Sequence, residues 1–465
     1  MFRVMNLAAK VPIGALAAAF LISDAAPALA ASEEDLAAIR SAISKLREDY
    51  EAKIKDLEDR LQKAETETAA AKASAAAAET AAQEAQKTAQ AAPPSAPIPE
   101  PPQIPRVPQS QNAFNPGIAA VLNGFFVAAN HDPTDIKIPG FALGDQAAGS
   151  PRGFSIGESE VNLTANIDPF TLGWLNLAFE PDNSVSVEEA YIQTTSLGSG
   201  FTLRAGRFFS GIAYLNERHA HDWSFSDASL PYRVFLNGQY GDDGLQARWL
   251  APTNIFLELG TEIMRGDAFP AGGAANHGVG SFSLFAHAGD DINDSSSWLA
   301  GLSFLHTRSD RREDTAGDIF SGTDNIGIAS AVYKWAPGGN PTIQNLILSS
   351  EVFFGSEDGH FNGVKVNTNR TGWYLQGVYQ FQPRWSFGLR YAQLGSNDVP
   401  LALVGSTIDN MGWTPRAESA LLEFDTSEFG RFRLQYNHDD SDRRPIDEVL
   451  LQYTVIYGPH PAHRY

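Results

Sequence analysis

The sequence predicts an all-β transmembrane barrel of about 16 antiparallel strands, preceded by an α-helical coiled coil. Two observations predict the barrel. Apolar and polar residues alternate in segment after segment between residues 112 and 465, and short and long connections take turns between these segments. A third observation, a long run without Gly or Pro, predicts the helix. A strand with one face in lipid and the other in a lumen has this two-residue period, so we expect the barrel to span a membrane.

The alternation can be counted along the chain. It is clearest at residues 160–167, 175–180, 373–381, 385–392 and 431–437, where apolar side chains occupy every second position. Weaker candidates begin near Ile118, Val187, Phe201, Gly244, Ile255, Ser281, Trp298, Ile326, Asn345, Arg416 and Val449. Together they give about sixteen strands, an even number as expected of a bacterial barrel.

The connections differ in length. Asp168-Pro169 and Gln382-Pro383 are tight, whereas Asn216–Asp243 and Arg308–Asp324 are long and polar. Short periplasmic turns and long outer loops are typical of outer-membrane barrels. The segment Asn216–Asp243 contains several aromatic residues and either folds inward as a constriction or is an ordinary surface loop. A soluble β-sandwich would also alternate, but so many strands with polar interior positions favour a water-filled lumen.

The first thirty residues predict a signal peptide. Arg3 and Lys10 supply a basic start, Val11–Ile22 is an apolar core, and Ala28-Leu29-Ala30 is a small-residue cleavage site. The alternative is an uncleaved membrane anchor, but the apolar run is shorter than the ~20 residues of a spanning helix. The predicted domains are therefore a signal peptide (1–30), a coiled-coil helix (31–92), a Pro-rich linker (93–111) and the barrel (112–465).

The helical segment 31–92 is rich in Ala, Glu, Lys and Gln, which favour helix. Its apolar residues, such as Leu36, Ile39 and Ile43, form a narrow strip that needs identical partners to be buried. We expect an oligomeric coiled coil in the periplasm, with an extended, solvated spacer as the alternative. The following eight prolines predict a stiff, extended linker.

Composition excludes several classes of function. The 465-residue chain has no cysteine, which removes thiolate metal sites and cysteine nucleophiles. Its net charge of −21 argues against nucleic acid as a partner, because neutralising phosphates requires excess Lys and Arg. No His-Glu-x-x-His motif or phosphate-binding glycine loop is present, so we do not expect an enzyme.

The run from Ser186 to Asn216 resembles the phosphate-selective porin family. That family has an acidic-Ala-Tyr strand, a Gly-bounded turn, and a strand that ends in Gly-(Gln/Arg)-Phe. The corresponding residues here are Glu189, Ala190 and Tyr191, then Arg204, Gly206, Arg207 and Phe208, while Phe209-Ser210-Gly211 replaces the family's Pro-Phe-Gly. The resemblance implies a trimeric, sixteen-stranded barrel, in many members with an N-terminal coil. The acidic excess nevertheless favours weak cation preference over phosphate, which needs inward Lys and Arg.

Four further runs resemble uncharacterised proteobacterial proteins that are labelled zinc-regulated TonB-dependent outer-membrane receptors. These runs are QNAFNP, GFSIGESEVNLTANID, GRFFSGIAYLNERHAHDW and QYGDDGLQARWLAPT. The resemblance implies a link to zinc. A TonB-dependent receptor carries a globular plug before its barrel, whereas a helix and a Pro-rich linker occupy that position here.

Strand parity places a set of charged side chains on the lumenal face, where charges determine the selectivity of a channel. Acidic residues belong to early strands and arginines to late strands, so two opposed walls could generate a transverse field. The alternative is that these charges pair with each other or only solvate the lumen. The predicted pore-lining residues are Glu158, Glu160, Glu180, Glu258, Glu262, Arg390, Arg431 and Arg433.

One segment has the composition of a metal site. Glu217, His219 and His221 follow each other at a spacing of two, with Asp222 adjacent, and in an extended segment the first three would share a face. Two imidazoles and a carboxylate suit zinc. The alternative is that both histidines hydrogen-bond backbone or water. No other cofactor is expected.

The sequence therefore predicts a porin-type channel for passive diffusion in the outer membrane of a Gram-negative bacterium. Its expected partners are outer-membrane lipid, two further copies in a homotrimer formed through coil and barrel, and possible peptidoglycan contacts of the coil. Two alternatives stay open: an uptake protein for zinc or a zinc complex, and a structural tether anchored by the barrel.

Overall fold

The computed structural model describes Lys55 and residues 116–273, 276 and 278–458. The barrel belongs to the second of two units into which the chain divides, residues 109–465. The predicted signal peptide (1–30), coiled coil (31–92) and linker (93–111) lie outside the described residues, apart from Lys55, and stay predictions.

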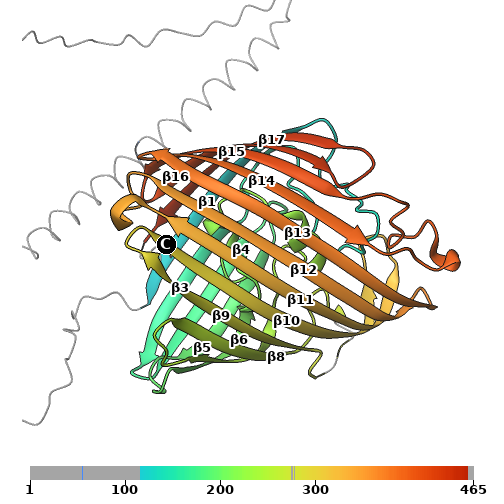
Figure 1. Ribbon diagram of the computed structural model, residues 1–465, viewed down its shortest axis with the longest axis horizontal. Coiled ribbons are helices and arrows are strands. Elements are labelled where there is room, and N and C mark those ends of the chain that lie inside the picture. The colour runs from blue at the N-terminus through green and yellow to red at the C-terminus, as the bar shows by residue number, and fades with distance from the viewer. Residues whose placement is uncertain (1–54, 56–115, 274–275, 277, 459–465) are drawn as a thin grey trace, which may run out of the picture. The chain divides into compact units, whose positions relative to one another are not determined.

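The second unit is a closed antiparallel β-barrel (Figure 1). From β3 to β17, each strand pairs with the next one along the chain. β1 closes the ring, because Ala120 pairs with Tyr457 of β17 on one edge and Gly117 pairs with Thr164 of β3 on the other. The three-residue β2 pairs with β1 beyond β3 and continues the same position in the ring. The described residues thus form sixteen strand positions, which confirms the predicted number.

The first half of the barrel contains β1 (Gly117–Ala129), β2 (Gly153–Ser155), β3 (Ser159–Asp168), β4 (Thr171–Phe179), β5 (Val185–Thr194), β6 (Phe201–Phe209), β7 (Gly241–Leu250), β8 (Phe256–Met264) and β9 (Ser281–Asn293). The second half contains β10 (Ser296–Glu313), β11 (Ile319–Trp335), β12 (Asn345–Phe361), β13 (Val364–Gln382), β14 (Trp385–Ser396), β15 (Arg416–Ser427), β16 (Gly430–Asp440) and β17 (Ile446–Tyr457). Between the strands lie η1 (Ala220–Asp222), α2 (Leu230–Leu236), η3 (Pro337–Gly339) and η4 (Leu401–Leu403). No helix in the described part of the chain is both long and apolar enough to cross a membrane.

The two faces of the wall follow the predicted two-residue period. Along β13, Trp373, Leu375 and Tyr379 are exposed on the outside, while Tyr374 and Gln376 between them are buried on the inside. The strands before and after β13 repeat the pattern, with many exposed Leu, Phe, Tyr and Ile side chains. An apolar outer surface of this kind is suited to lipid, and closure of the ring leaves no unpaired strand edge.

One predicted loop is a pair of strands instead. Residues 308–324 were expected to form a long polar connection, but β10 continues to Glu313 and β11 begins at Ile319. Arg312 and Asp324 of this region point into the barrel and form buried ion pairs with neighbouring strands, whereas Arg308, Asp310, Arg311 and Glu313 are exposed. Arg312 contacts Glu357 at 2.5 Å, and Arg370 contacts Asp324 at 2.5 Å. Because these ion pairs are buried inside the barrel, where β10 and β11 extend its wall, the charges of Arg312 and Asp324 do not indicate a solvated loop.

Candidate functional site

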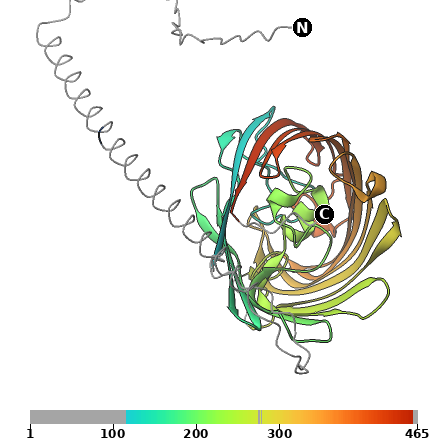
Figure 2. The same cartoon turned by 90° about the vertical axis from the view of Figure 1, so that its left-hand side faces the viewer.

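The connection between β6 and β7, residues 210–240, folds into the barrel, and we call it the inward loop. Figure 2 looks along the barrel and shows α2, drawn in green, inside the ring of strands. All seven residues of α2 are buried, and the helix contacts β12, β13 and β14. Of the two alternatives left open by the sequence, the structure contains the inward fold.

The local sequence explains why this loop forms a short helix. Ser229 precedes the helix in an extended conformation, and Pro231 occupies its first turn, where the missing N–H costs nothing. Asn237 ends the helix in the left-handed conformation that Asn tolerates. Between these residues, Val234 and Phe235 are fully buried. The helix therefore presents an apolar surface to the inner face of the wall.

The helix is also held by a buried hydrogen-bond network centred on Glu351 of β12. The hydroxyls of Tyr232 in α2 and Tyr374 in β13 each donate to Glu351 Oε2 at 2.6 Å. The backbone N–H of Tyr214 donates to Glu351 Oε1 at 2.7 Å, and that of Leu215 donates to the Tyr232 hydroxyl at 2.9 Å. The two halves of the inward loop are thus connected to one wall residue.

Five of the predicted pore-lining residues contact the inward loop: Glu160, Glu262, Arg390, Arg431 and Arg433. Glu262 of β8 accepts hydrogen bonds from the Ser210 hydroxyl and, at 2.8 Å, from the Gly211 N–H. Arg390 of β14 pairs with Asp227 at 2.6 Å. Arg433 of β16 donates to the backbone carbonyl of Trp223. Inward-pointing charges on four separated strands therefore position the loop.

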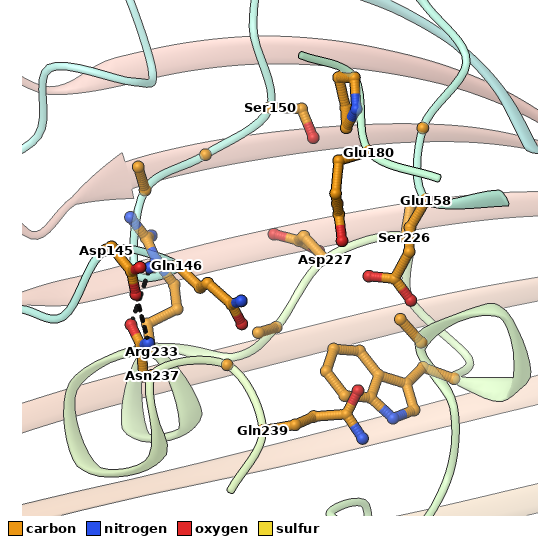
Figure 3. Close-up of a pocket in the computed structure, with 18 of the residues that line it drawn as sticks. Asp145, Gln146, Ser150, Glu158, Glu180, Ser226, Asp227, Arg233, Asn237 and Gln239 are labelled. Atoms are coloured by element: carbon orange, nitrogen blue, oxygen red, sulfur yellow. Dashed lines mark hydrogen bonds between the residues drawn. The ribbon is translucent and has the colours of Figure 1, made fainter. Parts of the chain in front are cut away.

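The inward loop lies between two cavities. The first, of about 880 Å³, is at the long-loop end and is lined by Glu158 and Glu180, together with Asp227 from the loop (Figure 3). The second, of about 1160 Å³, is at the end of the short turns. Of the predicted pore-lining residues, the second cavity is lined by Glu160, Glu258, Arg431 and Arg433. Glu262 and Arg390 line neither cavity, since both are buried against the loop.

The charges of the wall pair locally. Arg431 and Arg433 both reach Glu423 of the neighbouring β15, at 3.6 and 2.6 Å. Glu258 pairs with Arg248 of β7 at 3.3 Å. Arg433 on β16 and Glu160 on β3 are separated in the ring by only β17 and β1. These charges therefore form local ion pairs, which was the predicted alternative to an acidic wall that faces a basic wall across the lumen.

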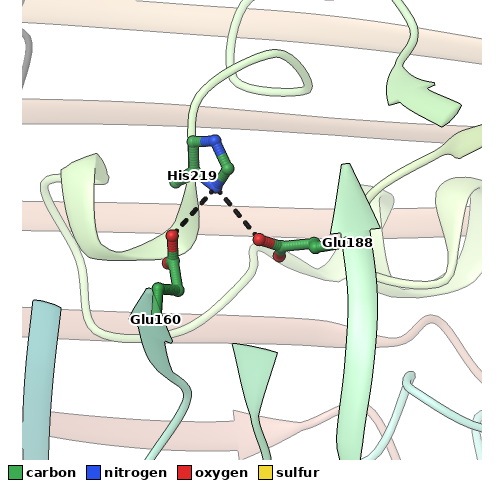
Figure 4. Close-up of side chains that lie close together, drawn as sticks. All are labelled: Glu160, Glu188 and His219. Carbon is green, nitrogen blue, oxygen red and sulfur yellow. Dashed lines mark hydrogen bonds and ion pairs between the residues drawn. The ribbon is translucent and has the colours of Figure 1, made fainter. Parts of the chain in front are cut away.

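A cluster of carboxylates surrounds the two histidines of the inward loop, and Figure 4 shows Glu160 and Glu188 beside His219. His219 Nδ1 lies 3.3 Å from Glu160 Oε2 of β3 and 3.1 Å from Glu188 Oε2 of β5. His219 Nε2 lies 3.2 Å from Glu189 Oε2. His221 Nδ1 contacts the other oxygen of Glu160 at 2.7 Å, and the two imidazole rings stack with centroids 5.5 Å apart. The histidines and glutamates thus connect the loop to the wall.

A β-bulge explains how two consecutive glutamates reach the same ring. Asn176 of β4 pairs with Glu189 and the next residue, Leu177, pairs with Val187, so Glu188 is an extra residue in β5. In a regular strand, Glu188 and Glu189 would point to opposite faces. A bulge redirects one side chain, and bulges are frequent near functional sites. Strict alternation could therefore place only one of these glutamates in the lumen.

The surroundings shift the pKa of His219 and of Glu158, which precedes β3. Burial alone would lower the pKa of His219, but the charge of Glu160 and the hydrogen bonds to Glu188 and Glu189 outweigh it and raise that pKa well above its usual range. Burial raises the pKa of Glu158, and the charges of Glu188 and Glu160 add to this increase. The cluster thus favours the protonated, cationic form of the His219 imidazole.

The predicted metal ligands are only partly brought together. Glu217 turns away from His219 and pairs with Arg248, and with Arg204 at 3.6 Å. The extended conformation expected for this segment is wrong, because residues 220–222 form the 3-10 helix η1. Asp222 Oδ1 lies 3.6 Å from His221 Nε2 and does not join the carboxylates around His219. Glu160, predicted only as a pore-lining residue, takes the place expected for Glu217.

Comparisons with known proteins give no named family. No family model matches the chain. An uncharacterized protein from Aquifex aeolicus (strain VF5) is 28% identical over 389 residues, which cover 77% of this chain and 81% of that protein.

Among solved structures, the barrel is similar to several outer-membrane proteins. The loop L8 deletion mutant of OmpT from Vibrio cholerae has a TM-score of 0.47 at 10% identity and covers 73% of this chain and 98% of its own. The channel DcaP of Acinetobacter baumannii scores 0.48 at 10% identity, covering 73% and 96%. OprB of Pseudomonas putida scores 0.48 at 13% identity, covering 73% and 94%.

Proposed function

We propose that the protein is a porin-type channel through which small solutes diffuse passively, and that the inward loop forms its constriction. The observation that carries this proposal is the closed barrel with two cavities on either side of residues 210–240. A barrel of this size encloses a lumen that its own wall side chains cannot fill. A loop folded into the lumen then determines the width of the passage, while the wall supplies the polar surface.

The exposed apolar side chains of the wall support a location in lipid, and the proposed membrane is the outer membrane of a Gram-negative bacterium. The short turns at one end and the longer loops at the other favour the usual orientation, with the turns in the periplasm. The periplasmic coiled coil and its contacts with peptidoglycan depend on residues outside the described part of the chain, and like the homotrimer they stay predictions.

The proposed selectivity is a weak preference for cations. The lining of the first cavity holds nine Asp and Glu residues against two arginines, Arg207 and Arg233, and the chain carries a net charge of −21. Acidic side chains that line a passage attract cations and repel anions. Four arginines of the second cavity are paired, Arg431 and Arg433 with Glu423 and Arg204 and Arg248 with Glu217, which reduces their effect on mobile ions.

Conductance across a planar lipid bilayer tests the proposal. The full-length protein, purified in detergent, should give stepwise ohmic currents, with reversal potentials that indicate cation preference; a trimer should open in steps of three. A change in electrophoretic mobility on heating verifies that the inserted protein is folded. Folded protein that inserts but carries no current would contradict the channel.

The same measurements separate the two alternatives predicted from the sequence. A tether predicts no conductance, and a coil that retains peptidoglycan in a pull-down experiment. A zinc-uptake protein predicts a passage that is closed to other ions and a tight zinc site. For the second alternative, the structure offers the cluster around His219 in place of the predicted set with Glu217.

A further inference from the structure

We propose that Glu160, Glu188 and His219 bind a divalent transition-metal ion of the zinc class, which connects the inward loop to the barrel wall. The three ligands come from β3, β5 and the loop, so they belong to three separate segments of the chain. One oxygen or nitrogen of each lies within 4.8 Å of the others. The inference rests on this cluster and the closed barrel, and it does not require the protein to conduct solutes.

The distances between the donor atoms suit a small metal ion. In a tetrahedral zinc site with bonds of about 2.0–2.2 Å, neighbouring ligand atoms lie roughly 3.3–3.6 Å apart. His219 Nδ1 lies 3.3 Å from Glu160 Oε2 and 3.1 Å from Glu188 Oε2. The two carboxylates approach the same ring nitrogen from different strands. A metal ion could therefore bind with only small movements of the side chains.

Asn176 of β4 supplies a fourth donor position. Its Nδ2 atom lies 2.7 Å from Glu160 Oε2, 2.6 Å from Glu188 Oε2 and 3.3 Å from His219 Nδ1. The side chain is fully buried, and its Oδ1 atom has no hydrogen-bond partner in the described part of the chain. Rotating the amide by half a turn exchanges the two atoms and brings this unpartnered oxygen to the three donors. Four ligand atoms would then surround one point.

The groups behind the ligands have the arrangement found around protein metal sites. A histidine that binds metal through one ring nitrogen commonly donates its other N–H to a carboxylate, which orients the ring. His219 Nε2 lies 3.2 Å from Glu189 Oε2, and the Phe209 N–H donates to the other oxygen of Glu189 at 3.2 Å. His221 contacts the second oxygen of Glu160 at 2.7 Å. Glu189 therefore restricts the orientation of the His219 ring, and His221 restricts that of the Glu160 carboxylate.

The charge of the cluster also calls for a cation. Glu160, Glu188 and Glu189 meet around one imidazole, and their salt-bridge partners among the described residues are His219 and His221, with no lysine or arginine. Buried carboxylates at this density are stable only when they are neutralised. The imidazole nitrogen favours zinc and its neighbours over calcium or magnesium, which prefer oxygen ligands alone.

Zinc titration of the full-length protein tests this site. Protein treated with EDTA and held in detergent is titrated with zinc chloride by calorimetry, and one ion per chain should bind. His219→Ala should lower the affinity at least ~100-fold, and Glu189→Gln, which removes only the supporting carboxylate, by about 10–100-fold. His287→Ala is the matched control, because His287 is also a lumenal histidine that faces a glutamate, with its Nδ1 atom 3.4 Å from Glu258 Oε1. The zinc affinity of this variant should equal that of the wild type.

X-ray absorption at the zinc edge provides a second readout. Wild-type protein should show nitrogen and oxygen neighbours with the outer-shell signal of one imidazole, and His219→Ala should lose that signal. Three results would overturn the site: no saturable zinc binding by folded protein, equal zinc affinity of wild type and His219→Ala, or displacement of zinc by an equal concentration of calcium. The conductance of the EDTA-treated protein tests the channel separately, so either proposal can fail alone.

Discussion

The inward loop contacts the barrel through two sides of different chemistry. On one side, α2 packs Tyr232 and Phe235 against Phe353 of β12, with ring centroids 5.4 and 5.5 Å apart. On the other side, His219 and His221 meet glutamates of β3 and β5. The first contact is mainly apolar and the second is ionic, although both are buried inside the same lumen.

The difference shows how one loop can be held in place inside a water-filled lumen and still present charged groups there. Burying apolar surface stabilises the loop regardless of pH or salt and requires only complementary shape. The ionic side contributes less to stability, since desolvation offsets much of the attraction between buried charges. Its carboxylates instead provide a site that can attract and hold cations. We infer that the side facing β12–β14 sets the position of the loop, while the side facing β3–β5 sets its chemistry.

The largest expected effect follows from removing the apolar contact. Phe235 is fully buried, and Phe235→Ala should destabilise the docked loop by about 3–5 kcal/mol, as for other buried aromatic residues. Hydrogen exchange of residues 210–240 in detergent measures the change, and the mean conductance should rise as the loop leaves the lumen. Phe387→Ala, on the exposed outer face, should leave the loop protected. Unchanged exchange in Phe235→Ala would show that another contact positions the loop.

A smaller effect is expected from an ionic contact of the same loop. Arg390 donates to Asp227 through two nitrogens, at 2.6 Å to Oδ1 and 2.9 Å to the backbone oxygen. Arg390→Met should destabilise the docked loop by about 1.5–3 kcal/mol, the range for hydrogen bonds to charged groups. Gln435 and Asn437 still donate to Asp227 in this variant, which limits the loss.

A double-mutant cycle with Asp227→Asn isolates this pair, with hydrogen exchange of the loop as the measured quantity. The two substitutions should be less than additive, because each removes the same interaction. Additivity within about 0.3–0.5 kcal/mol would mean that Arg390 and Asp227 act independently, contrary to the contact seen here.

Much of the barrel wall could be predicted, because its two-residue period follows from the geometry of a β-strand. A closed barrel has only two faces, so Trp373, Leu375 and Tyr379 had to lie on the opposite face from Tyr374 and Gln376, and the structure confirms this. Most strand starts were also near their predicted positions. Two starts differ more: β13 begins at Val364 instead of near Trp373, and β11 begins at Ile319 instead of near Ile326. There the charges of Arg312 and Asp324 resemble those of a solvated loop, although they are neutralised inside the barrel.

The candidate site was harder to predict, because it is assembled by long-range contacts. The spacing of His219 and His221 identified the histidines, but nothing local showed that Glu217 would bind Arg248. Glu188 reaches the lumen only through a bulge, which alternation does not predict. The one available signal was the consecutive pair Glu188-Glu189 within a strand, where two adjacent charges conflict with a lipid-facing position.

The smallest expected effect concerns a charge on the wall of the second cavity. Glu258 lines this cavity and is paired with Arg248 at 3.3 Å, so Glu258→Gln should lower the cation preference slightly without changing the docked loop. Because the charge acts through water, the shift in reversal potential should be clear at 0.01 M salt, where the Debye length is roughly 30 Å, and vanish near 1 M, where it is about 3 Å. Glu418→Gln, an exposed residue of β15, controls for net charge and should produce no shift. A shift of equal size at both salt concentrations would indicate a change in the shape of the passage, and it would place Glu258 among the residues that position the loop.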